Sequence, residues 1–204
     1  MKPTKHELIK YYDDRYRRNK TSWESDERDR LMYKHVRDEP HGTILDVGSG
    51  TGHSLKILYR RFGDASEYHA LDLSDEALKL AKAKIPHLIT HQGFVESLDL
   101  DLFDLVLCMG TAEHFIDLEV GLAKLKNISR TLYLEVPNCL AYSPGDQSFR
   151  KTAIGSHQYE WHLPRDIWEQ IILGAGFEIK KEITGPIDSC KFIWLLTTSN
   201  RENG

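Results

Sequence analysis

The stretch that decides the fold is ILDVGSGTGHSL, which runs from Ile44 to Leu55. Its first four residues suit a buried β-strand that carries one acid, and an amphipathic run begins at its end. Between the two, three glycines stand within five residues, Gly48, Gly50 and Gly52. Glycine has no β-carbon, so it allows tight turns and lets another group approach the main chain closely. The stretch therefore predicts a strand, a tight turn and a helix, with room for a ligand against the backbone of the turn.

Strand-like and helix-like segments alternate along the rest of the chain. The expected strands after the glycine turn cover residues 67–74, 87–92, 102–110, 131–138, 176–183 and 190–198. The expected helices cover residues 53–63, 75–84, 117–129 and a segment that starts at Pro164 and runs to about Gly174. The last two strands flank a turn region and are expected to pair antiparallel. Repeated alternation of this kind predicts an α/β domain with a mainly parallel sheet.

Composition sets the broad class. The chain has 204 residues, 40% of them hydrophobic and 28% charged, with a net charge of −4. This length suits one compact unit, and the charge lacks the basic excess of proteins that bind nucleic acid in bulk. The three cysteines are far apart and form no C-x-x-C, so neither a disulfide framework nor a cysteine zinc site is expected. No apolar run approaches membrane-spanning length, and we expect a soluble, cytoplasmic protein with no metal and no membrane contact.

The glycine turn alone leaves several classes of site open. The dinucleotide pattern G-x-G-x-x-G, counted from Gly48, requires a glycine at position 53, where the chain has His53. The G-K-[ST] ending of a phosphate-binding P-loop is absent as well. A nicotinamide-dependent oxidoreductase is therefore disfavoured. A tight turn without any ligand remains the simplest alternative.

The segment ILDVGSGTG resembles the first motif of the class I S-adenosylmethionine-dependent methyltransferases, and the likeness extends from about Leu31 to the C-terminus. The resemblance implies a Rossmann-like, doubly wound, seven-stranded sheet with helices on both faces. It also implies S-adenosylmethionine as cofactor and S-adenosylhomocysteine as product. In this family the glycine loop lies against the methionine part of the cofactor, and an acid at the position of Asp46 orders the loop.

Further segments extend the likeness to the rest of a cofactor site. Asp72 ends the second strand, twenty residues beyond Gly52, where a carboxylate can accept both ribose hydroxyls. The segment HQGFVESLDL is similar to the family's adenine-binding segment, although Phe94 replaces the usual acid. A helical arginine often reaches the cofactor's carboxylate, and Arg30 is our first choice, with Arg28 second. The residues expected to contact the cofactor are Asp46, Gly48, Ser49, Gly50, Gly52, Asp72, Leu73, Phe94, Val95, Met109 and Arg30.

The expected reaction needs a positioned nucleophile, and an oxygen nucleophile of high pKa also needs a general base. The segment FDLVLCMGTAEHF is similar to that of small-molecule methyltransferases and lacks the N-P-P-[YF] type of amide methyltransferases. Histidine is the usual base near neutral pH. The candidates are His114, His157 and His162, each of which could instead be a structural residue. Four aromatic residues could line the acceptor pocket or anchor the surrounding loop: Tyr142, Phe149, Tyr159 and Trp161.

We therefore expect a methyltransferase that acts on a small molecule, with oxygen as one option for the acceptor atom. Alternatives are a protein or carbohydrate acceptor, or a module that binds the cofactor without catalysis. The expected organisation is an N-terminal helical cap over residues 1–38 and a cofactor-binding domain over residues 39–204. A substrate-covering loop at residues 138–163 belongs to that domain, and the protein is expected to be a monomer or a homodimer.

Overall fold

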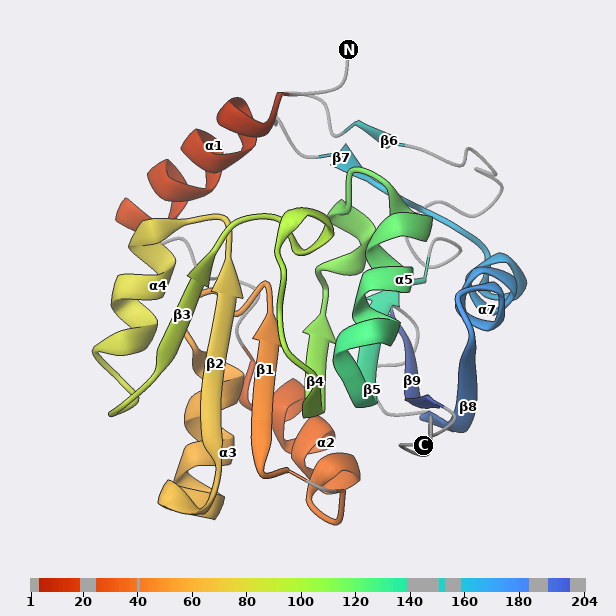
Figure 1. Cartoon of the computed structure of the whole chain (residues 1–204). Coiled ribbons are helices and arrows are strands. Elements are labelled where there is room, and N and C mark those ends of the chain that lie inside the picture. Colours follow the sequence, from red (N-terminus) through yellow and green to blue (C-terminus); the bar gives the residue numbers. More distant parts are fainter. Residues whose placement is uncertain are drawn as a thin grey trace.

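A single mixed sheet forms the centre of the computed structural model, which describes residues 4–18, 25–39, 41–138, 151–152, 159–183 and 191–198. Within that part of the chain the sheet has seven strands in the order β3-β2-β1-β4-β5-β9-β8 (Figure 1). These are β1 Thr43–Val47, β2 Glu67–Asp72, β3 Ile89–Gln92, β4 Phe103–Met109, β5 Ser129–Pro137, β8 Phe177–Ile183 and β9 Lys191–Thr198. Strands β1 to β5 pair in parallel, whereas β9 runs antiparallel to both β5 and β8. The predicted fold, including the antiparallel C-terminal pair, is confirmed.

The helices begin and end close to the expected residues. They are α1 Lys5–Arg17, α2 Asp26–Val36, α3 His53–Phe62, α4 Asp75–Lys82, α5 Leu118–Ile128 and α7 Arg165–Gly174. Short 3-10 turns lie at η1 Gly63–Ala65, η2 Val95–Ser97 and η3 Ala112–His114. The described part of the N-terminal helical cap, expected over residues 1–38, contains the two helices α1 and α2. Thr4 caps α1 and Ser25 caps α2, and each side chain accepts a hydrogen bond from a main-chain N–H in the first turn of its helix.

Alternate residues of the central strands face two separate cores. On one face Ile44 of β1 and Leu105 of β4 pack with apolar residues of α2, α3 and α4, among them Met32, Val36, Leu55, Leu58 and Leu78. On the other face Leu45 and Val106 pack with residues of α5 and α7, among them Leu122, Leu125, Trp168 and Ile172. Helices therefore cover both faces, and the parallel strands are buried as their apolar sequence requires.

Local contacts explain where α4 begins and why α5 contains a glycine. Ser74 caps α4, as expected, because its side chain accepts the N–H of Ala77. Helix α5 contains Gly121, and a β-carbon built there would lie 2.2 Å from the Phe115 ring. The glycine thus lets α5 pack closely on the segment that follows β4.

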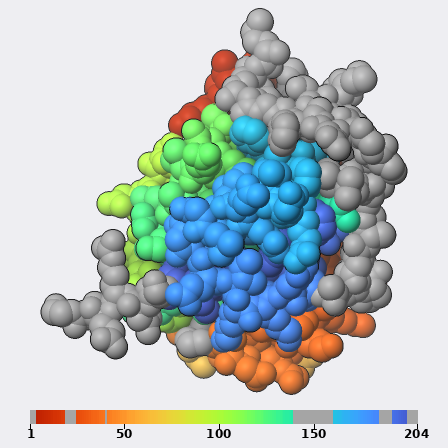
Figure 2. Space-filling view, turned by 90° about the vertical axis from the view of Figure 1, so that its right-hand side faces the viewer, coloured from red at the N-terminus to blue at the C-terminus, as the bar shows by residue number. Residues whose placement is uncertain are grey.

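The strand order reverses between β1 and β4, and this reversal positions the candidate site. In such sheets ligands bind outside the carboxyl ends of the strands, at the point of reversal. Helix α1 lies beyond this edge of the sheet, above the ends of β2 and β3 (Figure 1). Helix α7 and strand β8 instead form the surface at the far end of the sheet (Figure 2).

Little of the expected substrate-covering loop at residues 138–163 lies within the described residues. Lys151–Thr152 (β6) pairs antiparallel with Tyr159–Glu160 (β7), and this short ladder also lies beyond the carboxyl edge. Of the four aromatic residues named for the loop, Tyr142 and Phe149 lie outside the described residues. Among the helices described, none is long and apolar enough to cross a membrane.

Candidate active site

The glycine turn connects β1 to α3 and is held against β2. Gly48, Gly50 and Gly52 have φ angles of 72°, 52° and 72°, in the left-handed region that side chains disfavour. The main-chain N–H groups of Gly48 and Ser49 both donate to the Leu71 carbonyl, at 2.8 and 3.1 Å. These three positions therefore require glycine for the shape of the turn itself.

Close packing is a second reason for glycine at two of these positions. A β-carbon at Gly48 would lie 2.2 Å from the Thr111 hydroxyl oxygen, and one at Gly52 would lie 2.9 Å from the β-carbon of Ala81. At these two positions the direction in which a side chain would point is thus filled by the protein. Close packing on Thr111 and on α4 explains the two glycines, while the main chain at Gly48 still faces the neighbouring cavity.

That cavity has a volume of about 390 Å³ and lies at the carboxyl ends of β1 to β4, beneath α1. Its volume falls within the range of about 300–1,000 Å³ that is typical of ligand pockets. It is lined by α1, by the ends of β1, β2 and β4, and by the segments that follow these strands and β3, including Tyr12, Arg15, Tyr16, Gly48, Leu71, Asp72, Leu73, Gly93, Phe94, Val95, Met109, Gly110, Thr111 and His114. Besides Gly48 after β1, five residues expected to contact the cofactor meet here from the ends of three further strands: Asp72, Leu73, Phe94, Val95 and Met109.

Asp72 is held in place at the wall of this cavity by main-chain hydrogen bonds. One carboxylate oxygen accepts the N–H of Gly50 at 2.9 Å, and the other accepts the N–H of Ser74 at 2.9 Å. The side chain is buried, and burial raises the pKa of Asp72 to about 6, although the main-chain hydrogen bonds act in the opposite direction. A carboxylate has about four lone-pair sites, so each oxygen can accept a further hydrogen bond.

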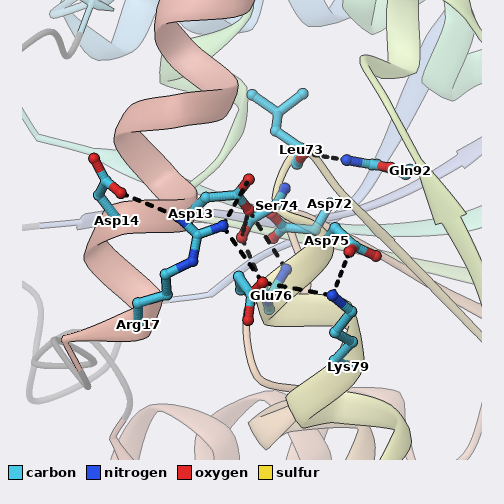
Figure 3. A network of polar contacts seen from close by, with 11 residues as sticks. Asp13, Asp14, Arg17, Asp72, Leu73, Ser74, Asp75, Glu76, Lys79 and Gln92 are labelled. Carbon is cyan, nitrogen blue, oxygen red and sulfur yellow. Dashed lines mark hydrogen bonds and ion pairs between the residues drawn. The ribbon is translucent and has the colours of Figure 1, made fainter.

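Helix α1 is fastened beside Asp72 by a polar network (Figure 3). The hydroxyl of Ser74 donates to Asp13 at 2.5 Å, and the N–H of Glu76 donates to the same oxygen at 3.4 Å. Arg17 pairs with Glu76 at 3.4 Å and with Asp14 at 3.2 Å. Because α1 also supplies Tyr12, Arg15 and Tyr16 to the cavity wall, this network fixes one side of the site.

A second, smaller hollow of about 30 Å³ adjoins the glycine turn on the side of α2. Asp46 and Ser49, both expected at the cofactor, line it together with Asp29, His53 and Ser54. Asp29 accepts a hydrogen bond from Ser54 at 2.6 Å and lies 3.1 Å from His53. Burial, and next the nearby charge of Asp29, raises the pKa of Asp46 well above its usual value. Two buried carboxylates so placed are suited to a cationic group.

Arg30 is not at the site. It is exposed on α2, whereas Arg28, the second choice, lines both hollows. Two residues along a helix differ by about 200° in direction, so the two arginines point to opposite sides. Met32 and Val36 are both fully buried, and Arg28 continues this row at a spacing of four residues. That row was the signal in the sequence that favoured Arg28.

Arg28 belongs to a buried group of charges that sequence analysis did not assemble. Its Nε lies 2.9 Å from Oε1 of Glu135, which is 2% exposed at the end of β5. Lys191, the first residue of β9, lies 3.9 Å from both Glu135 and Glu113. The acid inside the apolar run TLYLEVP was a visible signal, but its partners come from distant parts of the chain.

The candidate bases occupy different places. His114 ends η3 and lines the main cavity, with its ring centroid 6.4 Å from that of Tyr12. His162 does not line it, and its Nε2 lies 2.9 Å from Glu160. The hydrogen bond from His162 lowers the pKa of Glu160, and the charges of His114 and Lys191 act in the same direction. His157 lies outside the described residues.

Trp161 braces the segment that carries His114. Its N–H donates to the carbonyl of Glu113 at 2.7 Å, and its indole N–H donates to the carbonyl of Phe115 at 2.8 Å. Trp161 was expected either to line the acceptor pocket or to anchor the surrounding loop. These two hydrogen bonds give it the anchoring position. In the part of the chain described, no group of three or more histidine, cysteine, aspartate and glutamate side chains is arranged to hold a metal ion.

Comparisons with known proteins agree with this architecture. Residues 44–133 match the family model of a methyltransferase domain. The chain is 26% identical over 184 residues to the hybrid PKS-NRPS synthetase pydA of an Acremonium species, a match that covers 77% of this chain and 4% of that protein. The chain thus corresponds to a small part of that relative.

Two solved structures are similar over nearly the whole chain, each with a TM-score of 0.73. One is the 1,6-didemethyltoxoflavin-N1-methyltransferase of Burkholderia thailandensis with bound S-adenosylhomocysteine, at 17% identity, covering 97% of this chain and 92% of that one. The other is the [4+2]-cyclase SpnF, at 13% identity, covering 97% of both chains. At these identities the likeness shows the fold. Residues 44–133 thus match a methyltransferase domain, and the whole chain has the fold of these two structures.

Proposed function

We propose that this protein transfers the methyl group of S-adenosylmethionine to an oxygen atom of a small-molecule acceptor. The proposed binding of the cofactor rests on the geometry of Asp72. This buried carboxylate lines the cavity, and main-chain N–H groups already orient both of its oxygens. Such a carboxylate suits the adjacent hydroxyls of a ribose, because each oxygen keeps capacity for one more donor.

The two hollows divide the proposed cofactor contacts. Leu73, Phe94 and Val95 line the cavity next to Asp72 and would hold the adenine. Asp46 and Asp29 line the smaller hollow and would attract the ammonium group of the methionine part, whose positive charge offsets their mutual repulsion. Met109 and Gly48 line both hollows and would lie between the two ends.

The bound cofactor supplies an activated methyl group, so the protein's task is to place the acceptor and exclude water. His114 and Phe115 line the cavity beyond Met109, and Tyr12 faces them from α1. These side chains form a partly aromatic wall that suits a small organic acceptor. The likeness to a segment of a synthetase of natural products supports a small-molecule acceptor as well.

A cofactor-binding module without methyl transfer is the second candidate. The observation that favours it is the similarity to a cyclase, since one fold can carry different chemistries. A protein or carbohydrate acceptor is a further variant of the methyltransferase proposal.

Transfer of label from S-[methyl-³H]adenosylmethionine tests this proposal. The protein is incubated with a metabolite extract, and the extract is then separated into small-molecule, polysaccharide and protein fractions. We expect label in the small-molecule fraction, in a bond that resists mild base as an ether does. Label in the protein or polysaccharide fraction would contradict the small-molecule acceptor, and no transfer despite cofactor binding would favour the silent module.

A further inference from the structure

Four charged side chains meet where β4 and β5 end and β9 begins: Arg28, Glu113, Glu135 and Lys191, here called the charged quartet. Arg28 and Glu135 form a direct ion pair at 2.9 Å. Glu113 and Lys191 approach only to 3.9 Å. Of the four, Arg28, Glu113 and Lys191 line the cavity. The quartet therefore forms one polar end of the space in which an acceptor would bind.

Glu113 has hydrogen-bonding capacity that the described residues leave unused. Its side chain is 6% exposed, and its Oε2 has no hydrogen-bond partner among the described residues. A buried carboxylate oxygen without a donor is costly, so such atoms in native proteins usually meet a ligand or water. Glu113 also lines the cavity, and its other oxygen, Oε1, lies on the side of Lys191, where a donor on a bound molecule can reach the carboxylate.

Gly110 keeps the space between these charges clear. A β-carbon built at this position would lie 3.1 Å from Arg28 Nη2, 3.6 Å from Glu113 Oε1 and 3.8 Å from Lys191 Nζ. The φ angle of Gly110 is 63°, which glycine adopts without strain. Three charged groups of alternating sign thus surround one point beside the end of β4.

The spacing and the charge balance together indicate the kind of group that fits. A separation of 3.9 Å exceeds the 2.7–3.2 Å of a hydrogen bond. A hydroxyl can bridge it, because it donates its proton to the carboxylate while its oxygen accepts from the ammonium. Two acids and two bases also leave the quartet without net charge. An anionic acceptor would meet Glu113 and Glu135, and a cationic one would meet Arg28 and Lys191.

We propose that Glu113 and Lys191 hold the methyl-accepting hydroxyl of a neutral alcohol, and that Glu113 takes its proton. This inference rests on the proposed function. In the step, the bond between the methyl carbon and the cofactor sulfur breaks, and sulfur keeps the electron pair. A bond forms between the methyl carbon and the hydroxyl oxygen, and the hydroxyl proton moves to the Glu113 carboxylate. Lys191 stabilises the negative charge that develops on the oxygen.

Three probes with the same ring separate the possible acceptor charges: trans-cyclohexane-1,2-diol, cyclohexanecarboxylate and cyclohexylammonium. Their affinities are measured by ligand-observed NMR on the complex with S-adenosylhomocysteine, whose own binding is checked by calorimetry. The wild-type complex should prefer the diol. Lys191→Met leaves excess negative charge and should shift the preference at least tenfold toward cyclohexylammonium. Glu113→Gln leaves excess positive charge and should shift it at least tenfold toward the carboxylate.

Lys124→Met is the matched control, since the Lys124 side chain is 26% exposed against 23% for Lys191 and pairs with Asp99 elsewhere. This control variant should bind the three probes in the same order of affinity as the wild type. Glu113→Gln should also reduce label transfer to the diol at least 100-fold while S-adenosylhomocysteine affinity stays within threefold, and Glu113→Asp should restore part of the rate.

Two results would overturn the inference: a wild-type complex that does not bind the diol in preference to the charged probes, or variants that keep the wild-type order. Either result with normal S-adenosylhomocysteine binding refutes the role of the quartet and leaves the proposed function standing. Absence of S-adenosylhomocysteine binding by the wild type would refute both.

Discussion

At the scale of single residues, the site concentrates buried charge that the fold alone does not need. Asp72 is buried with a pKa raised to about 6, mainly by burial, and Asp46 and Asp29 also have raised pKa values for that reason. A raised pKa means that the folded protein favours the neutral carboxyl, so ionisation above that pKa costs stability. Such a cost is expected at a site that a ligand later stabilises.

Asp72→Asn should therefore make the free protein more stable and the site weaker. From the ordinary value near 3.8 to about 6, the shift corresponds to at most about 3 kcal/mol. This gain should be fully present above pH 6 and should disappear as the pH falls through 6 toward 4, because Asp72 then becomes neutral in the wild type as well. Urea unfolding of both proteins at pH 5 and pH 8 measures the difference. A variant less stable than the wild type at pH 8 would contradict the prediction.

Arg28→Met should destabilise the protein by about 3 kcal/mol, because it leaves Glu135 buried without its direct partner. Glu135→Gln should cost a similar amount. The double variant should lose clearly less than the sum, since neither charge then remains unpaired. Denaturant unfolding of the four proteins gives the coupling energy. Additive losses would show that the pair at 2.9 Å contributes nothing to stability.

At the scale of elements, most helices and strands could be predicted from sequence because their signals are local. Ser74 caps α4 by a contact three residues away, and the apolar runs of β4 and β5 are continuous. The β6–β7 ladder could not be predicted, since it joins two residues to two residues within an irregular stretch. Which arginine of α2 points inward depends on which face of the helix is buried. The fully buried Met32 and Val36 define that face.

Helix α1 should act as a wall of the cofactor site that depends on Asp13. In Asp13→Ala the contacts with Ser74 and Glu76 are lost, so α1 should detach more often and S-adenosylhomocysteine affinity should fall about tenfold. Asp14→Ala is the control, because Asp14 is more exposed and pairs with Arg17 on the surface. Calorimetry and the rate of proteolysis within residues 5–17 report the effect. Equal affinities for the two variants would contradict this role of α1.

At the scale of the whole molecule, the sheet order gathers residues that are far apart in the sequence. The segment ILDVGSGTG and the spacing to Asp72 were sufficient to predict the fold and one half of the candidate site. The charged quartet could not be predicted, because Arg28, Glu135 and Lys191 come together only when β9 inserts beside β5. The close packing of Gly48 on Thr111 and of Gly52 on Ala81 could not be predicted for a similar reason, since these neighbours come together only in the folded chain. The division of the chain at residue 38 remains a prediction.

The central claim is that Asp72 holds the ribose of a sulfonium nucleoside beside the glycine turn. Calorimetric titration of S-adenosylhomocysteine and of NAD into the wild type, Asp72→Ala and Asp75→Ala tests it most directly. Asp75 is the control, an acid on the same turn whose side chain is 51% exposed. We predict that the wild type and Asp75→Ala bind S-adenosylhomocysteine and not NAD, and that Asp72→Ala binds it at least 100-fold more weakly, because two hydrogen bonds to a charged group are lost. Equal affinity of Asp72→Ala and the wild type, or tighter binding of NAD, would contradict the account.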